Sequence, residues 1–263
     1  MARQICERML KFRRMKTLYM FYQEVLEPLG LKYVYHMTHA DNLVPIFFTD
    51  RLYPHGNPYQ VRDISDKDVN DRRKRYDPIF YRPIHSYVPF YFNPKNSMLY
   101  KRRGEQDNIV IFAMNIEIVL IEGSIFTDGN ASSFSTEFFE DPWDLHKLDW
   151  DCINAETWYD KEDCKRKRMA EVLVPDCVPL NKVEKIICNN EETKSRVEEI
   201  LKEAEGPIMH KYPAKDPKKF PNLYTVLKKE VECVVDKSFY FSDFSDLRYD
   251  QSEALLEESF FPF

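Results

Sequence analysis

The chain has 263 residues, and its 43% hydrophobic and 14% aromatic content excludes an intrinsically disordered protein. The net charge of -6 excludes a uniformly basic nucleic-acid-binding surface, although it is compatible with local basic patches. Only 6 glycines occur, and no GxGxxG or GxxxxGK[ST] pattern is present, which argues against a glycine-rich nucleotide-binding loop.

The cysteines show no sign of a metal site. No CxxC pair and no Cys/His spacing typical of zinc occurs, so we expect free thiols and no bound metal. The first residues carry many charges without an apolar signal-peptide core. No run of about 18 apolar residues is present, and we therefore expect a cytoplasmic protein without a membrane span.

The first half of the chain is predicted to begin with an amphipathic helix that ends near Pro28 and Gly30. An alternating strand, two short helices and two further strands follow it. In chain order the predicted elements are helix 3–27, strand 31–38, helix 40–52, loop 53–70 leading into helix 66–75, strand 87–94 and strand 108–115.

The second half is predicted to contain a turn at Asp128 and Gly129, followed by an acidic segment that carries tryptophans. A helix with a strong start signal comes later, because Asn189 and Glu192 have the spacing of a capping box. The elements are turn region 124–133, acidic segment 136–163, strands 170–175 and 183–189, helix 189–207 (stopped by Gly206 and Pro207) and strand 231–241.

Strands outnumber helices and do not alternate with them regularly, which indicates an α+β fold. We expect one domain over residues 31–241, because too little chain follows the Lys/Pro-rich loop at 210–222 to form a second core. Residues 1–30 then form an N-terminal helical extension. Residues 242–263 form an acidic and aromatic tail.

Several polar residues stand within or beside apolar strands. His36 and Thr38 share one face of a predicted strand, and Glu171 opens an apolar strand directly after the basic run 165–168. Arg72 and Arg73 are adjacent near the end of a short helix. Each feature alone also fits a structural role, since a strand histidine is often a hydrogen-bonded core residue and a basic run is often a solvated face.

The order of these motifs resembles the DarT family, toxin-type ADP-ribosyltransferases that modify bases in single-stranded DNA with NAD. The resemblance covers roughly residues 33–205. It implies an ADP-ribosyltransferase-like split antiparallel β-sandwich with flanking helices around a cleft. The motifs are YHMTHADNL, ISDKDVNDRRKR, HSYVPFYFNPKNSMLY, FTDGNAS, LDWDCINAETWYD and RKRMAEVLVP.

The resemblance implies a catalytic role for Glu171, whose carboxylate would stabilise the oxocarbenium-like ribose as the nicotinamide bond breaks. It implies that Arg73, the second of the paired arginines, contacts NAD and polarises the target base. An Arg73→Ala variant is expected to lose transfer while keeping its fold. The further NAD-binding residues that it implies are His36, Thr38, Asn42 and Tyr91.

The expected nucleic-acid contacts rest on basic and loop residues. They are Asn130, Lys165, Arg166, Arg168 and Arg72. Asn130 stands where family members often carry His, and this substitution leaves the choice of base open: thymidine is the default target and guanosine the alternative. Residues 165–168 also fit a simpler role as counterions of the acidic run 156–163.

NAD is the expected ADP-ribose donor, single-stranded DNA the expected substrate, and a macrodomain antitoxin the partner that the family implies. Two other functions remain open. The same chemistry can act on RNA or protein, or the chain can be a non-catalytic descendant that binds NAD or nucleic acid. The presence of His36, Arg73, Tyr91 and Glu171 speaks against the non-catalytic alternative.

Overall fold

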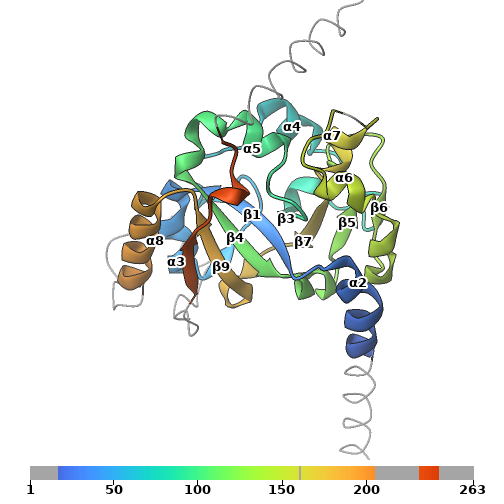
Figure 1. Cartoon of the computed structure of the whole chain (residues 1–263), viewed down its shortest axis with the longest axis horizontal. Coiled ribbons are helices and arrows are strands. Elements are labelled where there is room, and N and C mark those ends of the chain that lie inside the picture. Colours follow the sequence, from blue (N-terminus) through green and yellow to red (C-terminus); the bar gives the residue numbers. More distant parts are fainter. Residues whose placement is uncertain (1–16, 160, 205–230, 243–263) are drawn as a thin grey trace, which may run out of the picture.

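The computed structural model describes residues 17–159, 161–204 and 231–242. Its centre is a mixed eight-stranded sheet (Figure 1), and the described residues also form a two-stranded sheet. The eight strands, in spatial order, are β10 (Glu232–Val235), β9 (Val183–Cys188), β4 (Ile109–Asn115), β1 (Tyr33–His39), β3 (Tyr87–Tyr91), β7 (Glu171–Pro175), β5 (Ile125–Thr127) and β6 (Phe138–Phe139). The small sheet pairs β2 (Arg51–Leu52) with β8 (Val178–Pro179).

The large sheet is split between β1 and β3. These two strands pair at one position only, Tyr35 with Tyr91, whereas β1 pairs with β4 over its whole length. On the other side of the split, β3 pairs with β7 from Tyr87 to Tyr91. The sheet therefore opens into two halves, which confirms the predicted α+β fold with a split sheet. All strand pairs in it are antiparallel except β9 with β10, which the sequence did not indicate.

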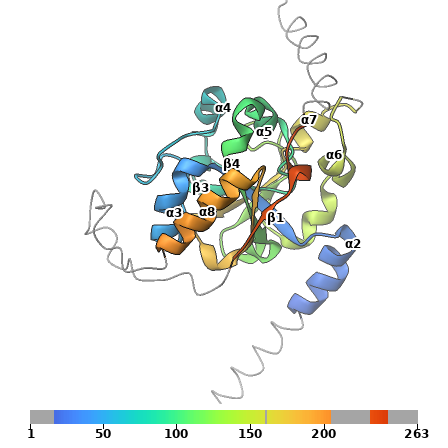
Figure 2. The ribbon, with the colours of Figure 1, turned by 60° about the vertical axis from the view of Figure 1, so that its left-hand side comes forward.

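Short helices flank the sheet. Helices α3 and α8 pack side by side at one end, while α6 and α7 lie towards the end that carries β5 and β6 (Figures 1 and 2). The helical elements are η1 (Tyr22–Leu26), α2 (Glu27–Leu29), η2 (Ala40–Asn42), α3 (Leu43–Thr49), α4 (Lys67–Arg72), η3 (Ile84–Ser86), α5 (Ser97–Lys101), η4 (Arg103–Asn108), η5 (Ile116–Leu120), η6 (Pro142–Lys147), α6 (Trp150–Asn154), α7 (Cys164–Lys167), η7 (Leu180–Lys182), α8 (Glu191–Ala204) and η8 (Lys237–Phe239).

The described part of the predicted N-terminal helix packs into the main core. It is helical from residue 17 to Leu29, and it ends at Gly30, whose φ of 65° is the left-handed conformation that glycine adopts at low cost. Phe21, Val25 and Leu26 are buried in the same cluster as the strands of the sheet. The beginning of this predicted helix lies outside the described residues, as do the insertion 210–222 and nearly all of the tail 242–263.

Helix α8 is the predicted 189–207 helix, but its cap differs from the prediction. Asn190, not Asn189, accepts a hydrogen bond from the backbone N–H of Thr193 at 2.8 Å. The helix begins at Glu191, one residue later than a cap at Asn189 requires, and Asn189 instead donates to Asp107 at 2.6 Å. The predicted stop at Gly206 and Pro207 lies outside the described residues.

Two short β-strands around the predicted turn were not expected. Residues before the turn form β5, residues after it form β6, and Phe126 of β5 pairs with Phe139 of β6. The intervening segment, residues 128–137, is called the β5–β6 loop below. No helix in the described ranges is long and apolar enough to cross a membrane.

Candidate active site

A cleft of ≈ 510 Å³ lies where the two halves of the sheet separate. Its wall is formed by β1, α3, β3, α4 and the segment 52–66. This volume lies within the range of small-molecule pockets, roughly 300–1,000 Å³. The cleft brings together six residues that the sequence singled out, namely His36, Thr38, Asn42, Arg73, Tyr91 and Asn130.

Glu171 is fully buried at the start of β7, opposite Tyr91 of β3. Its carboxylate accepts hydrogen bonds from both terminal nitrogens of Arg73. Oε1 is 2.8 Å from Nη1, and Oε2 is 3.1 Å from Nη1 and from Nη2. The backbone N–H of Ala131 donates to Oε1 at 2.9 Å. The carboxylate is thus fixed between a guanidinium and a main-chain amide.

Arg73 owes its position to the end of helix α4. Asp66 caps the start of this helix by accepting from Asp68 and Val69 N–H groups, and the helix ends at Arg72. Arg73 follows as the C-cap and is buried. Burial disfavours its charge, but the neighbouring Glu171 carboxylate outweighs this effect and raises the pKa of Arg73 above its ordinary value. Arg73 is therefore a fixed cation and not a proton acceptor.

Tyr91 lies beside this ion pair with its side chain buried. Burial, reinforced by the negative charge of Glu171, raises the pKa of the Tyr91 hydroxyl above its ordinary value. The side chain is therefore a neutral phenol, which offers an aromatic face and one O–H donor to the cleft.

His36 links β1 and β3 where their backbones stop pairing. Its Nδ1 lies 2.9 Å from the carbonyl oxygen of Pro89, so Nδ1 carries the proton of this hydrogen bond. Burial lowers the pKa of His36, although the bond to Pro89 opposes this shift. A neutral ring with its proton on Nδ1 leaves Nε2 as an acceptor on a residue that lines the cleft.

Asn42 has a more structural position than the resemblance implies. Its Nδ2 donates to Thr38 Oγ1 at 3.0 Å and to the carbonyl oxygen of Arg62 at 2.7 Å. Its Oδ1 accepts from the N–H groups of Val61 and Arg62, both at 2.8 Å. Both amide hydrogens and both oxygen lone pairs are thus used by the chain. Through these hydrogen bonds, Asn42 connects residues 61–62 of the cleft wall to Thr38 of β1.

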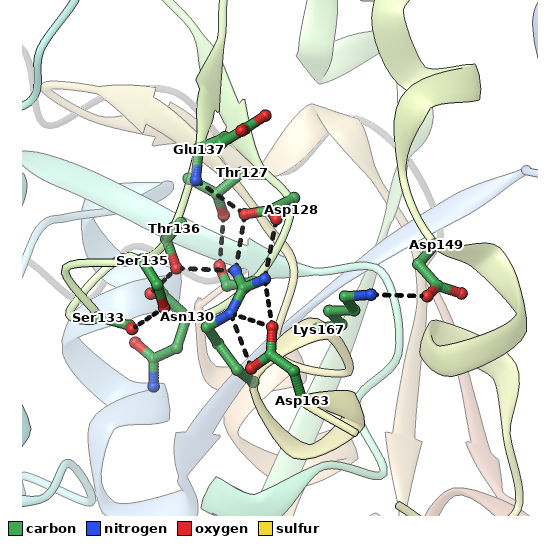
Figure 3. Close-up of polar contacts among 12 residues, drawn as sticks. Thr127, Asp128, Asn130, Ser133, Ser135, Thr136, Glu137, Asp149, Asp163 and Lys167 are labelled. Atoms are coloured by element: carbon green, nitrogen blue, oxygen red, sulfur yellow. Dashed lines mark hydrogen bonds and ion pairs between the residues drawn. The ribbon is translucent and has the colours of Figure 1, made fainter. Parts of the chain in front are cut away.

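Arg166 is held by acidic and hydroxyl side chains of the protein itself. Its Nη1 and Nη2 bond to the two carboxylate oxygens of Asp128 at 2.8 and 3.0 Å. Its Nε bonds to Asp163 at 2.8 Å, and its Nη1 also reaches Thr136 Oγ1 at 3.2 Å. Figure 3 shows Asp128, Thr136 and Asp163 converging on this point. The guanidinium therefore holds the β5–β6 loop against α7, and this set of contacts is called the Arg166 clamp below.

Arg168 also points into the protein, and only 3% of it is exposed. Its Nε donates to the carbonyl oxygen of Lys95 at 2.8 Å. Its Nη1 donates to the carbonyl oxygens of Ile153 and Ala155. Groups of the chain itself bind both guanidinium groups, and a nucleic-acid contact by Arg166 or Arg168 stays a prediction.

The remaining predicted nucleic-acid residues lie nearer the surface. Arg72 is exposed on the last turn of α4, and Lys165 is half-buried on α7. Asn130 lies in the β5–β6 loop (Figure 3) and lines the cleft. Its side-chain oxygen accepts from the Ser132 N–H at 2.9 Å. Of the three, only Asn130 contributes to the wall of the cleft.

Some groups at the site were missed by the sequence interpretation. The Ala131 N–H that bonds Glu171 is a main-chain donor and has no signature in the sequence. Thr127 Oγ1 accepts from the Glu171 N–H at 3.3 Å, which ties β5 to β7. His55 and His85 stack at 4.7 Å between ring centroids on the cleft wall. Among the residues that the structure describes, no group of three or more His, Cys, Asp or Glu residues is arranged to hold a metal.

Comparison with known proteins gives consistent matches. The sequence profile of the family described as "ssDNA thymidine ADP-ribosyltransferase, DarT" matches residues 35–216. A DNA ADP-ribosyl transferase of Thermus sp. (strain 2.9) is 32% identical over 183 residues, which are 65% of this chain and 87% of that protein. A fusion of a DNA ADP-ribosyl transferase and a DNA ADP-ribosyl glycohydrolase from Thermosipho africanus is 25% identical over 217 residues, or 79% of this chain and 54% of the fusion.

Solved structures of DarT from Thermus sp. 2.9 have the same fold. Its complex with ADP-ribosylated ssDNA superposes with a TM-score of 0.66 at 27% identity, covering 80% of this chain and 96% of that chain. Its complex with NAD+ gives a TM-score of 0.61 at 26% identity, covering 80% and 97%. The range matched by the family profile contains both Arg73 and Glu171. The chain therefore belongs to the DarT family of ssDNA thymidine ADP-ribosyltransferases.

Proposed function

We propose that this protein transfers ADP-ribose from NAD to a thymine base in single-stranded DNA, with Glu171 as the catalytic residue. One observation carries the proposal, namely the buried Glu171 carboxylate held by Arg73 and the Ala131 N–H beside a cleft of ≈ 510 Å³. Holding a carboxylate in fixed geometry is what electrostatic stabilisation of a developing cation requires.

In the proposed reaction, the bond between ribose C1′ and the nicotinamide nitrogen breaks, and nicotinamide leaves with the bonding electrons. The ribose then carries oxocarbenium-like positive charge. Glu171 stabilises this charge more strongly than it stabilises neutral ground-state ribose. A thymine ring nitrogen forms the new bond to C1′ and releases its proton.

We assign the other cleft residues by their contacts. His36 offers Nε2 and Tyr91 offers its ring and hydroxyl to NAD, while Thr38 and Asn42 hold the wall against which NAD binds. Arg73 keeps Glu171 in place and presents a permanent positive charge near the NAD phosphates.

On the DNA side, Asn130 meets the target base. Arg72 and Lys165 supply positive charge along the path of the strand. Guanosine is the alternative target. The Asn130 amide can both donate and accept hydrogen bonds, so it can pair with more than one base.

We further propose that the transferase activity is toxic to the cell and is reversed by a macrodomain antitoxin. The fused glycohydrolase of the Thermosipho relative supports such a partner. The protein acts in the cytoplasm, where its DNA substrate is found. Residues 31–241 are the catalytic domain, with 1–30 as an N-terminal extension and 242–263 as a tail.

The proposal is tested with NAD and matched DNA and RNA oligonucleotides in which thymine (uracil in RNA) or guanine is the single variable base. A mass gain of one ADP-ribose is expected on thymine-containing DNA alone. Glu171→Gln is expected to slow transfer by about 10²–10³-fold, the loss typical for one electrostatic group. Glu199→Gln, which changes an exposed residue of α8, is the matched control. Modification of RNA only, or wild-type transfer by Glu171→Gln, would contradict the proposal.

A further inference from the structure

Phe134 is the most exposed large apolar side chain in the described ranges, with 84% of its surface accessible. It lies in the β5–β6 loop. Isolated exposed apolar residues are common and need no explanation by themselves. Phe134 differs because the loop around it is held rigidly and is joined directly to Glu171.

Hydrogen bonds hold the loop at its base and also nearer its tip. At the base, the Asp128 N–H donates to the Glu137 carbonyl oxygen at 3.2 Å, and the Glu137 N–H donates to Asp128 Oδ1 at 2.9 Å. Nearer the tip, Thr136 Oγ1 donates to the Asn130 carbonyl oxygen at 2.7 Å, and Ser133 and Ser135 are joined through their hydroxyls (Figure 3). Arg166 adds two hydrogen bonds to the Asp128 carboxylate. The loop residues on both sides of Phe134 are therefore held in place by hydrogen bonds before any ligand binds.

Arg75 places positive charge next to the Phe134 ring. Its guanidinium carbon lies 4.9 Å from the ring centroid, and its Nη2 donates to the carbonyl oxygens of Ala131 and Ser133 at 2.8 and 2.6 Å. A cation beside an exposed aromatic ring is the combination that binds single-stranded nucleic acid, because the ring stacks on a base and the charge attracts the phosphate backbone.

The position of Phe134 relative to Glu171 limits which base it can meet. The Ala131 N–H is bonded to Glu171, and Phe134 follows three residues later. Three residues span at most about 11 Å even when fully extended. The Phe134 backbone therefore lies within about 11 Å of the amide that bonds Glu171, which places the ring near the reacting nucleotide.

We propose that Phe134, backed by Arg75, is a stacking platform for a nucleobase adjacent to the target thymine. This inference rests on the proposed function and identifies how the site selects single-stranded substrate. A duplex keeps its bases stacked on each other, whereas a single strand can place an unstacked base on the ring. Phe134 is a positioning residue, since it acts through the neighbouring nucleotide and not on the reacting atoms.

The experiment measures kcat/KM for oligonucleotides with one thymine and a single abasic site at each flanking position in turn. Wild-type enzyme is expected to lose about 5- to 100-fold at one flanking position, the range for one lost base–aromatic stack. Phe134→Ala is expected to modify the intact and the abasic oligonucleotide at that position equally. Phe134→Trp is expected to restore the discrimination, since a larger ring stacks on the same base.

Tyr19→Ala removes an aromatic ring of comparable exposure from the N-terminal helix and serves as the control, with wild-type discrimination expected. Unchanged discrimination by Phe134→Ala would overturn the inference. A parallel loss of NAD affinity in Phe134→Ala would also overturn it, because the loop would then have distorted the cleft. Failure of the wild type to modify any DNA would refute the proposed function itself. This outcome differs from the two results for Phe134→Ala, which concern the stacking role alone.

Discussion

At the scale of single residues, the buried Arg73–Glu171 pair dominates the site. Both side chains are almost fully withdrawn from water, and two nitrogens of one bond two oxygens of the other. Such a pair contributes little net stability, but removal of one partner leaves an uncompensated buried charge. The pair therefore serves to orient the carboxylate, and the protein depends on both members being present.

This geometry changes what is expected of Arg73→Ala. The sequence suggested that the variant keeps its fold, but the buried Glu171 would then lack its counter-charge, and a loss of about 3–5 kcal/mol in unfolding free energy is expected. The double variant Arg73→Met with Glu171→Leu is expected to recover most of this loss. Urea denaturation of Arg73→Met, Glu171→Leu and the double variant measures the cycle.

A surface ion pair provides the comparison. Arg82 pairs with Asp176 at positions that remain partly exposed. Arg82→Met is expected to cost no more than about 1 kcal/mol, since exposed pairs contribute little. Equal losses for Arg82→Met and Arg73→Ala would show that burial of the Arg73–Glu171 pair does not govern its energetics.

At the scale of elements, the short helix α7 and the β5–β6 loop act as one unit. Arg166 of α7 bonds Asp128 in the loop, and its carbonyl oxygen accepts from the Asn130 N–H at 3.1 Å. Gly129 lies so close to Arg166 that a Cβ there would come within 2.5 Å of Nη1. The glycine is therefore required for close approach, in addition to the turn that the sequence predicted.

Loss of this clamp is expected to affect catalysis at a distance. Arg166→Ala should loosen the β5–β6 loop and displace the Ala131 N–H from Glu171. Transfer is expected to fall by about 10²-fold, the effect of a misplacement of roughly 1 Å at a reacting centre. Hydrogen exchange of the amides in residues 129–136 should accelerate in the same variant.

The matched control for the clamp is Lys167→Ala. Lys167 lies on the same helix, but its ammonium bonds Asp149 at 3.0 Å, away from the loop (Figure 3). Both variants lose one basic residue of the run 165–168, so a DNA-binding role of the whole run predicts similar losses. A loss confined to Arg166→Ala identifies loop positioning as the cause.

At the scale of the whole molecule, three buried or half-buried histidines make stability depend on pH. Burial is the largest of the causes that lower the pKa values of His36, His39 and His85 below the ordinary value near 6.5. Between the folded and unfolded pKa values, the unfolded chain binds more protons than the folded protein. Their contribution is therefore complete above about pH 6.5 and is lost as the pH falls towards the folded pKa values.

The expected result is a fall in unfolding free energy between pH 6.5 and 5, above the range in which most carboxylates titrate. Urea denaturation over pH 5–7.5 measures it. His36→Gln removes one of the three groups and is expected to give a shallower slope than the wild type. A slope that is identical in the variant would show that His36 does not titrate in this window.

Much of the fold and part of the site were determined by the sequence. Local hydrophobic periodicity indicated the strands, since an alternating or continuous apolar run forms a strand wherever it packs. The ordered motifs identified His36, Arg73, Tyr91 and Glu171, and these residues do line or border one cleft. A cap at Asn189 was predicted one residue too early, because adjacent asparagines are indistinguishable without the backbone conformation.

The tertiary structure alone decided which groups meet. Arg73 and Glu171 are 98 residues apart, and their pairing depends on how α4 packs against β7. The basic run 165–168 looked like one surface, yet Arg166 and Arg168 are bonded to carboxylates and carbonyls from distant segments. A sequence gives the charge of a side chain, but its direction is set by the partners that folding brings within hydrogen-bonding distance.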